Sequence, residues 1–367
     1  MNVLFALLTW LYCLFLVWLE RGVSKICRIN KDKIIPAEKQ SISIIVAAKN
    51  ELDNLPALLE SLSRLDYPKD CFEIILVNDH STDGSSKYLR SQQQCLEVNV
   101  IEFTGAIEGL VGKKAAIQTG INAAKFDVLA FTDADCLVPD TWLQEINRVF
   151  DSGTDYLLAY SLMKRQTSDG IFRLKNFERS IYYALAAAGL NYRIPFTSSA
   201  CNMVYRKSLF EQSGGFMGIG NLLSGDDDLL LMKMMPFMRK SAYNPSPKMQ
   251  VTSIDGTDRA KHHQTNIRRA SKFRYHPWWL KGLSAFVFVY FIMFYRSLWL
   301  LITGKASRLL SLSLILKTTA EYFLTKRHLK QIGRSELAVL YPVQILLFPA
   351  QFIFYALRGT LGKFKWK

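Results

Sequence analysis

The sequence has no cysteine pair at the spacing of a zinc site. Six cysteines are scattered through the 367 residues, and no Cys-x-x-Cys motif occurs. They are Cys13, Cys27, Cys71, Cys95, Cys136 and Cys201. This pattern excludes a disulfide-stapled fold and argues against a structural zinc centre, so we expect reduced thiols in a cytosolic environment.

Two glycine-rich motifs are also missing. The sequence contains neither Gly-x-Gly-x-x-Gly nor Gly-x-x-x-x-Gly-Lys-[Ser/Thr], so nothing supports a dinucleotide-binding fingerprint or a Walker loop. Internal repeats and low-complexity segments are absent as well. Half of the residues are hydrophobic and 13% are aromatic, which is typical of a folded chain with a sizeable core.

Acidic residues are too few to balance the basic ones: 31 Asp and Glu stand against 46 Lys and Arg, a formal charge of +15. Such an excess suits nucleic acid, an anionic membrane or phosphorylated substrates. The segment KFRYHPWWLK (272–281) mixes aromatic and basic residues as the headgroup region of a membrane requires. No helix-turn-helix pattern or stacking platform accompanies it, so we expect a membrane partner and no nucleic acid.

Long uncharged runs lie near both ends of the chain. Residues 2–19 carry no charge and approach the ~20 apolar residues that cross a bilayer. No basic segment precedes them and no small-residue cleavage site follows, which predicts an uncleaved anchor over residues 1–20. Basic residues come next, and the positive-inside rule places the following segment in the cytoplasm. These are Arg21, Lys25, Arg28, Lys31 and Lys33.

The C-terminal region, residues 283–367, is predicted to hold two or three membrane helices. Residues 283–303 and 336–357 are long enough to span, whereas 311–324 is marginal because it contains Lys317 and Glu321. Arg296 lies within the first of these segments. It is expected to pair with Glu321, to snorkel toward the interface or to bind a lipid phosphate.

Residues 41 to about 275 have the pattern of an α/β domain. SISIIVAA (41–48) and FEIILVN (72–78) are continuous β-branched runs, typical of strands buried on both faces of a parallel sheet. Between them, apolar residues recur at helical spacing. The sequence then predicts a helix (83–96), a strand (97–103), a helix (112–125) and a strand (127–133). This alternation favours a doubly wound, mostly parallel sheet with its ligand site at the carboxyl ends of the strands.

Carboxylates follow three of the predicted strands. Glu51 follows the first, Asp79 the second, and Asp133 and Asp135 the fourth. Two carboxylates one residue apart repel each other, so we expect a divalent metal or a basic cluster beside them. A carboxylate such as Asp79, directly after a buried strand, suits hydrogen bonds from a base or a ribose.

Six blocks of sequence, in this order, resemble the membrane-associated family 2 glycosyltransferases. They are IIVAAKNE, ILVNDHSTDGS, GKKAAIQTGI, FTDADC, CNMVYRKSLFEQSGGF and SGDDDLLL. The likeness covers roughly residues 41–275. It implies a GT-A fold that binds a nucleotide-diphosphosugar and the activity of a hexosyltransferase-like enzyme.

The resemblance also implies roles for the strand-end carboxylates. Asp135, the last residue of the Asp-x-Asp motif, would contact a Mg²⁺ or Mn²⁺ ion that bridges to the diphosphate, and Asp133 would lie near the ribose or sugar. Glu51 and Asp79 match positions that hold uracil and ribose in relatives.

Two lysines, Lys113 and Lys114, begin a predicted helix. There an ammonium group and the N-terminal helix dipole both favour phosphate. We predict that Lys113 binds the diphosphate, with a solvated lysine as the alternative, and that Lys114 is a solvated lysine.

Three consecutive carboxylates open the helix in SGDDDLLLMKM. The resemblance aligns Asp227 with the catalytic base of the family, which takes the proton from the acceptor hydroxyl during inversion. Asp226 is the alternative base. One of the three carboxylates is expected only to complement the helix dipole.

The sequence differs from the processive members of this family in one motif. Processive members carry Gln-x-x-Arg-Trp, and the comparable region here is HHQTNIRRASK (262–272). Arg268 is retained and could hold the diphosphate, with a membrane-facing charge as the alternative, but Arg269 stands in the place of the tryptophan. This favours addition of one sugar over processive polysaccharide synthesis, which remains the alternative.

The sequence thus predicts an inverting, metal-dependent transferase of the cell (inner) membrane with a cytoplasmic catalytic domain. It would move a sugar from a nucleotide sugar, expected to be a UDP-sugar, to a lipid or lipid-linked acceptor. A membrane-tethered, non-catalytic nucleotide-sugar sensor is the alternative of another class. The sugar, the acceptor, the number of spans and the oligomeric state stay open.

Overall fold

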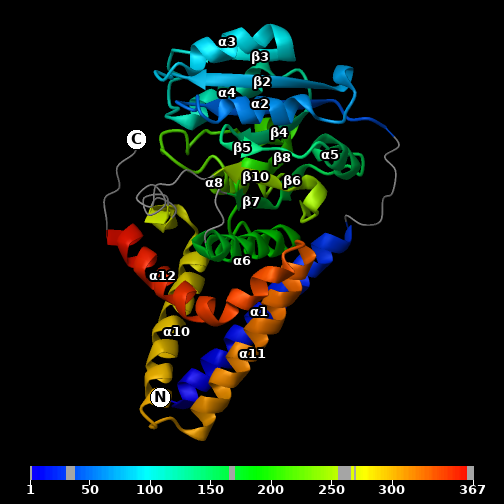
Figure 1. Cartoon of the computed structure of the whole chain (residues 1–367). Coiled ribbons are helices and arrows are strands. Elements are labelled where there is room, and N and C mark those ends of the chain that lie inside the picture. The colour runs from blue at the N-terminus through cyan, green and yellow to red at the C-terminus, as the bar shows by residue number, and fades with distance from the viewer. Residues whose placement is uncertain (1, 30–37, 165–169, 255–265, 268–269, 362–367) are drawn as a thin grey trace. The chain divides into compact units, whose positions relative to one another are not determined.

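A computed structural model describes residues 2–29, 38–164, 170–254, 266–267 and 270–361 (Figure 1). The chain forms two compact units. The α/β unit comprises residues 22–172 and 185–256, and the helical unit comprises residues 1–21, 173–184 and 257–367.

Over the described ranges, the α/β unit contains a main sheet of seven strands in the order β3-β2-β1-β4-β8-β6-β9. The strands are β1 (Ile42–Ala48), β2 (Phe72–Asp79), β3 (Val98–Phe103), β4 (Val128–Asp133), β6 (Tyr156–Ala159), β8 (Met203–Arg206) and β9 (Ser241–Asn244). The first four in spatial order are parallel, whereas β8 is antiparallel to both of its neighbours. The predicted doubly wound, mostly parallel sheet is confirmed.

A smaller sheet and short helices complete the α/β unit. The smaller sheet has the order β5-β10-β7. Its strands are β5 (Cys136–Leu137), β7 (Ser161–Lys164) and β10 (Val251–Ile254). The helices are α2 (Leu55–Ser63), α3 (Ser85–Leu96), α4 (Lys113–Ala123), α5 (Trp142–Phe150), α7 (Lys207–Gln212) and α8 (Asp228–Met234), with 3₁₀ turns η1 (Lys69–Cys71), η2 (Ala200–Asn202) and η3 (Pro247–Met249).

The core of the α/β unit lies on both faces of the main sheet because successive side chains of a strand point to opposite sides. Ile44 and Val46 of β1 belong to one apolar cluster with the leucines of α2 and with Trp142 of α5. On the other face, α4 packs against β1 and β2. A Cβ atom at Gly120 would lie 2.6 Å from Cγ2 of Ile45, so only glycine permits this close approach of helix and sheet.

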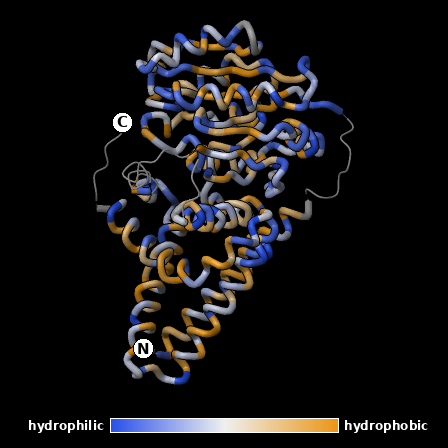
Figure 2. Tube along the Cα trace, in the orientation of Figure 1, coloured by the Kyte–Doolittle hydropathy of each residue, from blue (hydrophilic) through white to orange (hydrophobic). Residues whose placement is uncertain are grey.

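The helical unit is built from long helices, and Figure 2 shows hydrophobic residues along them. They are α10 (Trp278–Ile302), α11 (Arg308–Gln331) and α12 (Tyr341–Leu361), with 3₁₀ turns η4 (Lys272–Tyr275) and η5 (Ser335–Leu340) and parts of α1 (Asn2–Ile29) and α6 (Gly170–Tyr192). By length and composition, three segments of the described chain could cross a membrane: Asn2–Cys27, Trp278–Ile302 and Ser335–Gly359. The sequence predicted three or four membrane helices, and the described chain contains three candidates for them. Helix α11 is not one of these candidates.

Of the alternatives expected for Arg296, the pairing with Glu321 is wrong. Nζ of Lys317 lies 2.8 Å from Oε2 of Glu321, because residues four apart share one face of a helix. The hydroxyls of Tyr12 and Tyr341 donate to the same carboxylate at 2.7 and 3.1 Å. Among the residues that the structure describes, no ion pair involves Arg296.

Candidate active site

The carboxyl ends of the parallel strands bring the predicted acidic residues to one edge of the sheet. Ala47 of β1 is paired with Val77 of β2 on one side and with Asp133 of β4 on the other. Val77 and Asp133 are therefore level across the sheet, two strands or roughly 10 Å apart, and Asp79 lies two residues further along β2.

A small pocket at this edge contains a lysine between two carboxylates. Nζ of Lys113 forms an ion pair with Asp133 and lies 3.9 Å from Oδ2 of Asp226. The pocket is lined by Ile45, Ala47, Lys113, Ile117, Phe131, Thr132, Asp133, Ala200, Met203, Tyr205 and Asp226. It thus combines side chains from β1, α4, β4, η2, β8 and the segment before α8.

Lys113 remains a cation in this setting. Burial alone would lower its pKa, but the negative charges of Asp133 and Asp226 raise the pKa above the ordinary value. The side chain occupies the first position of α4, after Gly112 at φ +60° and ψ −141°, a backbone conformation suited to glycine. A positive charge and the N-terminus of a helix therefore meet at the sheet edge, which favours an anionic ligand.

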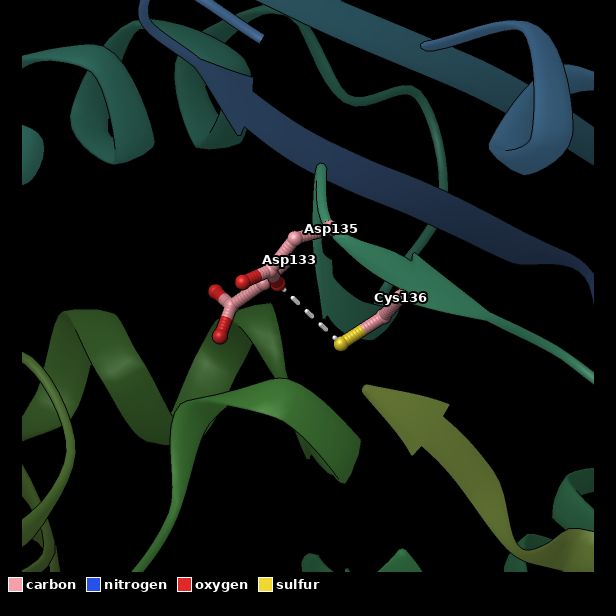
Figure 3. A group of neighbouring side chains, drawn as sticks. All are labelled: Asp133, Asp135 and Cys136. Atoms are coloured by element: carbon pink, nitrogen blue, oxygen red, sulfur yellow. Dashed lines mark hydrogen bonds between the residues drawn. The ribbon is translucent and has the colours of Figure 1, made fainter. Parts of the chain in front are cut away.

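Asp133, Asp135 and Cys136 form a group of candidate metal ligands (Figure 3). One donor atom from each lies within 4.8 Å of the others. Burial, followed by the charges of Asp133 and Glu51, raises the pKa of Asp135 to about 7. A divalent cation would relieve this crowding of carboxylates, so the residues present fit Mg²⁺ or Mn²⁺.

The two candidate bases have different surroundings. Asp226 lines the pocket beside Lys113. Asp227 is the N-cap of α8, where its Oδ1 accepts a hydrogen bond from the backbone N–H of Asp228 at 2.7 Å. The structure therefore brings Asp226 together with Lys113 and Asp133 and gives Asp227 a helix-capping contact.

Two further predicted residues, Glu51 and Asp79, lie outside the pocket lining. Oδ1 of Asp79 is 2.6 Å from Nδ1 of His80, and Oε2 of Glu51 accepts a hydrogen bond of 2.6 Å from Asn54. The charge of Glu51 nevertheless reaches Asp135. Arg268 lies outside the described residues.

Lys114 was wrongly expected to be solvated. Its side chain is 1% exposed, and Nζ donates to the carbonyl oxygens of Leu222 and Ser224. The neighbouring loop is also held by the N–H of Val111, which donates to Gly220 at 3.0 Å. The lysine thus positions the chain just before Asp226, and the only hint in the sequence was the apolar run Ala-Ala-Ile that follows it.

Fold and site together define an α/β domain with an acidic, lysine-containing site at the carboxyl edge of its sheet. Residues 43–214 match the model of glycosyl transferase family 2. This match covers just under half of the chain and most of the α/β unit's sheet.

Similar proteins include two enzymes whose names contain a lipid. The beta-monoglucosyldiacylglycerol synthase of Synechocystis sp. is 28% identical over 159 residues, which are 40% of this chain and 33% of that protein. The undecaprenyl-phosphate 4-deoxy-4-formamido-L-arabinose transferase of Aeromonas hydrophila is 29% identical over 137 residues, 36% of this chain and 39% of that protein. The chain thus matches between a third and two fifths of the length of these relatives.

A solved structure shares the fold over nearly the whole chain. It is a mannosyltransferase from Pyrobaculum calidifontis in complex with GDP-Man and Mn²⁺. The similarity covers 98% of this chain and 99% of that one, with a TM-score of 0.57 and 16% sequence identity. At this identity the likeness establishes the fold alone.

Proposed function

We propose that this protein is an inverting, metal-dependent glycosyltransferase of the cell membrane. It transfers a sugar from a nucleotide sugar, expected to be a UDP-sugar, to a lipid or lipid-linked acceptor at the cytoplasmic face. The observation that carries the proposal is the group of carboxylates around Lys113 and Asp135 in a domain that matches the family 2 model.

At the donor end, Asp133 and Asp135 would hold the cation, which neutralises the departing diphosphate when bound. Lys113 adds a fixed positive charge at the start of α4. Glu51 and Asp79 would contact the nucleoside, in agreement with the family resemblance. A divalent ion is also present in the Pyrobaculum calidifontis complex, which supports a cation here without choosing between Mg²⁺ and Mn²⁺.

At the acceptor end, a carboxylate must take the proton of the attacking hydroxyl. We propose Asp227 for this role, with Asp226 as the alternative. Three apolar helices long enough to span and relatives named for diacylglycerol and undecaprenyl phosphate support a lipid acceptor. The basic residues that follow the first span support a cytoplasmic catalytic domain.

The test is incubation of membranes containing the protein with a panel of labelled sugar nucleotides and Mn²⁺. A labelled, lipid-soluble product is expected with one donor, and its stereochemistry should be inverted. Membranes with the Asp135→Asn variant are the matched control. Donor binding without any transfer would instead support the sensor alternative.

The affinity of the site for a cation should depend on pH, because protons compete with the cation for Asp135. Because the pKa of Asp135 is raised to about 7, cation affinity should fall about tenfold per pH unit below that value, since one proton must be displaced. Electron paramagnetic resonance of free Mn²⁺ between pH 5 and 8 measures this. An affinity that does not change over this range would contradict it, and Asp135→Asn should abolish the dependence.

The same raised pKa affects the stability of the metal-free protein. The folded state holds the proton of Asp135 up to about pH 7, whereas the unfolded chain releases it near 3.8. This group therefore contributes to the unfolding free energy below pH 3.8, and the contribution is lost as the pH rises from 3.8 to about 7.

Lys114→Met should weaken donor binding although Lys114 lies outside the pocket lining. The substitution leaves the carbonyls of Leu222 and Ser224 without their shared donor. Hydrogen bonds from a charged group contribute about 1.5–3 kcal/mol, so we expect roughly 10-fold to 100-fold weaker binding. Calorimetric titration with the donor checks this, and Lys125→Met, at a lysine with 76% side-chain exposure, is the control that should bind normally.

A further inference from the structure

Helix α11 lies beside α1 along its whole length. Three contacts join the two helices in the same order along both: Asn2 to Ser307 (3.0 Å), Tyr12 to Glu321 (2.7 Å) and Glu20 to Arg327 (2.7 Å). At 1.5 Å per residue the contacts extend over roughly 30 Å of helix, which is about the thickness of the bilayer hydrocarbon. If α1 crosses a membrane, α11 lies at membrane depth throughout.

The polarity of α11 is reversed relative to a helix that faces water. Its outward side chains include Leu309, Leu312, Ile315 and Phe323, which are 43%, 63%, 61% and 61% exposed. Lys317 is instead fully buried against Glu321 and lies 4.2 Å from the ring centroid of Phe294. Charges that face the interior of a bundle and pair there are typical of membrane helices.

Charged residues also flank the exposed apolar stretch of α11. Arg308 precedes it, and Lys326, Arg327 and Lys330 follow it, all of them exposed. The charged residues between Arg308 and Lys326 are Lys317 and Glu321, which pair with each other on the inward side of the helix. Long basic side chains at both ends can reach the two headgroup layers.

Helix α12 begins and ends at the same end of the bundle. α10 and α11 are joined by the short loop 303–307, so Trp278 at the start of α10 and Gln331 at the end of α11 share one end. Gly359, near the end of α12, abuts Ala270 just before η4, and α12 packs against η4. Figure 1 shows α12 running across α10 rather than beside it.

Contacts with α6 agree with this placement of α12. The side-chain amide of Gln344 donates to the carbonyl oxygen of Leu174 at 3.1 Å, and the rings of Tyr182 and Phe348 lie 6.3 Å apart. This part of α6 also carries Arg173, Lys175, Glu178 and Arg179, which belong at a membrane surface rather than in hydrocarbon.

We propose that α11, rather than the more hydrophobic α12, is the third helix to cross the membrane. The face formed by Leu309, Leu312, Ile315 and Phe323 meets the acyl chains of the bilayer. The chain therefore returns at residue 332 to the side from which α10 departs, and α12 stays on that side. Only the identification of that side as cytoplasmic rests on the proposed function.

Labelling with a membrane-impermeant maleimide tests the topology in sealed vesicles of both orientations. The full-length variants Lys305→Cys and Lys330→Cys place thiols at the two ends of α11, and Lys125→Cys marks the side of the α/β unit. We expect Lys330→Cys to label with Lys125→Cys, and Lys305→Cys to label from the opposite side. The chain with native cysteines alone gives the background.

Labelling of Lys305→Cys and Lys330→Cys from the same side would overturn the proposal. If both Lys125→Cys and Lys330→Cys react from outside the cell, the proposed cytoplasmic orientation fails while the crossing of α11 stands. A spin label at Leu312→Cys provides a second readout, because it should be relaxed strongly by oxygen and weakly by a water-soluble nickel complex. Strong relaxation by nickel would place this face in water and also refute the proposal.

Discussion

Asp227→Asn is expected to lower the rate of sugar transfer by roughly 10²–10⁴-fold, the contribution of a positioned general base. Asparagine caps helices as well as aspartate does, so α8 should keep the contact that Asp227 makes with the N–H of Asp228. Donor affinity and thermal stability should therefore remain close to those of the parent. Single-turnover transfer of a labelled sugar, measured beside donor binding, separates the two effects.

Asp226→Asn serves as the matched variant. Asp226 helps to hold Lys113 at 3.9 Å, so its replacement should first weaken donor binding. If instead Asp226→Asn abolishes transfer at full donor occupancy and Asp227→Asn does not, the base is Asp226. Full transfer by both variants would exclude this segment as the source of the base.

Lys317→Met is expected to destabilise the helical unit strongly. It leaves the carboxylate of Glu321 with the hydroxyls of Tyr12 and Tyr341 but without its cation. Breaking a buried ion pair by removing one partner costs about 3–5 kcal/mol. The unfolding free energy of the protein in mixed detergent micelles, measured by titration with a denaturing detergent, should fall by that amount.

The double variant Lys317→Met with Glu321→Gln gives the control for this effect. It removes both charges, and most of the lost stability should return because no unpaired charge remains. Lys330→Met, at an exposed position of the same helix, should change little. A single variant as stable as the parent would mean that the pair contributes nothing to packing.

Local sequence patterns predicted the first half of the α/β unit. Continuous β-branched runs become β1 and β2, and the helical spacing between them becomes α2. These elements pair with near neighbours along the chain, so their patterns carry most of the information. The antiparallel insertion of β8 between β4 and β6 depends on pairing between distant segments, which hydrophobic periodicity does not encode.

The sequence predicted the strand-end carboxylates of the candidate site, but it did not predict which residues pair with them. The ion pairs of Lys113 with Asp133 and Asp226 join a helix, a strand and a distant loop. The burial of Lys114 depends on the same loop. Such contacts arise only when the chain has folded, because no local pattern distinguishes a buried lysine with carbonyl partners from a solvated one.

The sequence by itself determined the alternation of strands and helices, the acidic edge of the sheet and the hydrophobic helices near the two ends of the chain. These depend on the side-chain types of residues close together in the chain. Only the tertiary structure decided that Lys113 lies between two carboxylates, that Glu321 pairs with Lys317, and that α11 accompanies α1. Each of these depends on which distant surfaces meet, and therefore on packing rather than on local pattern.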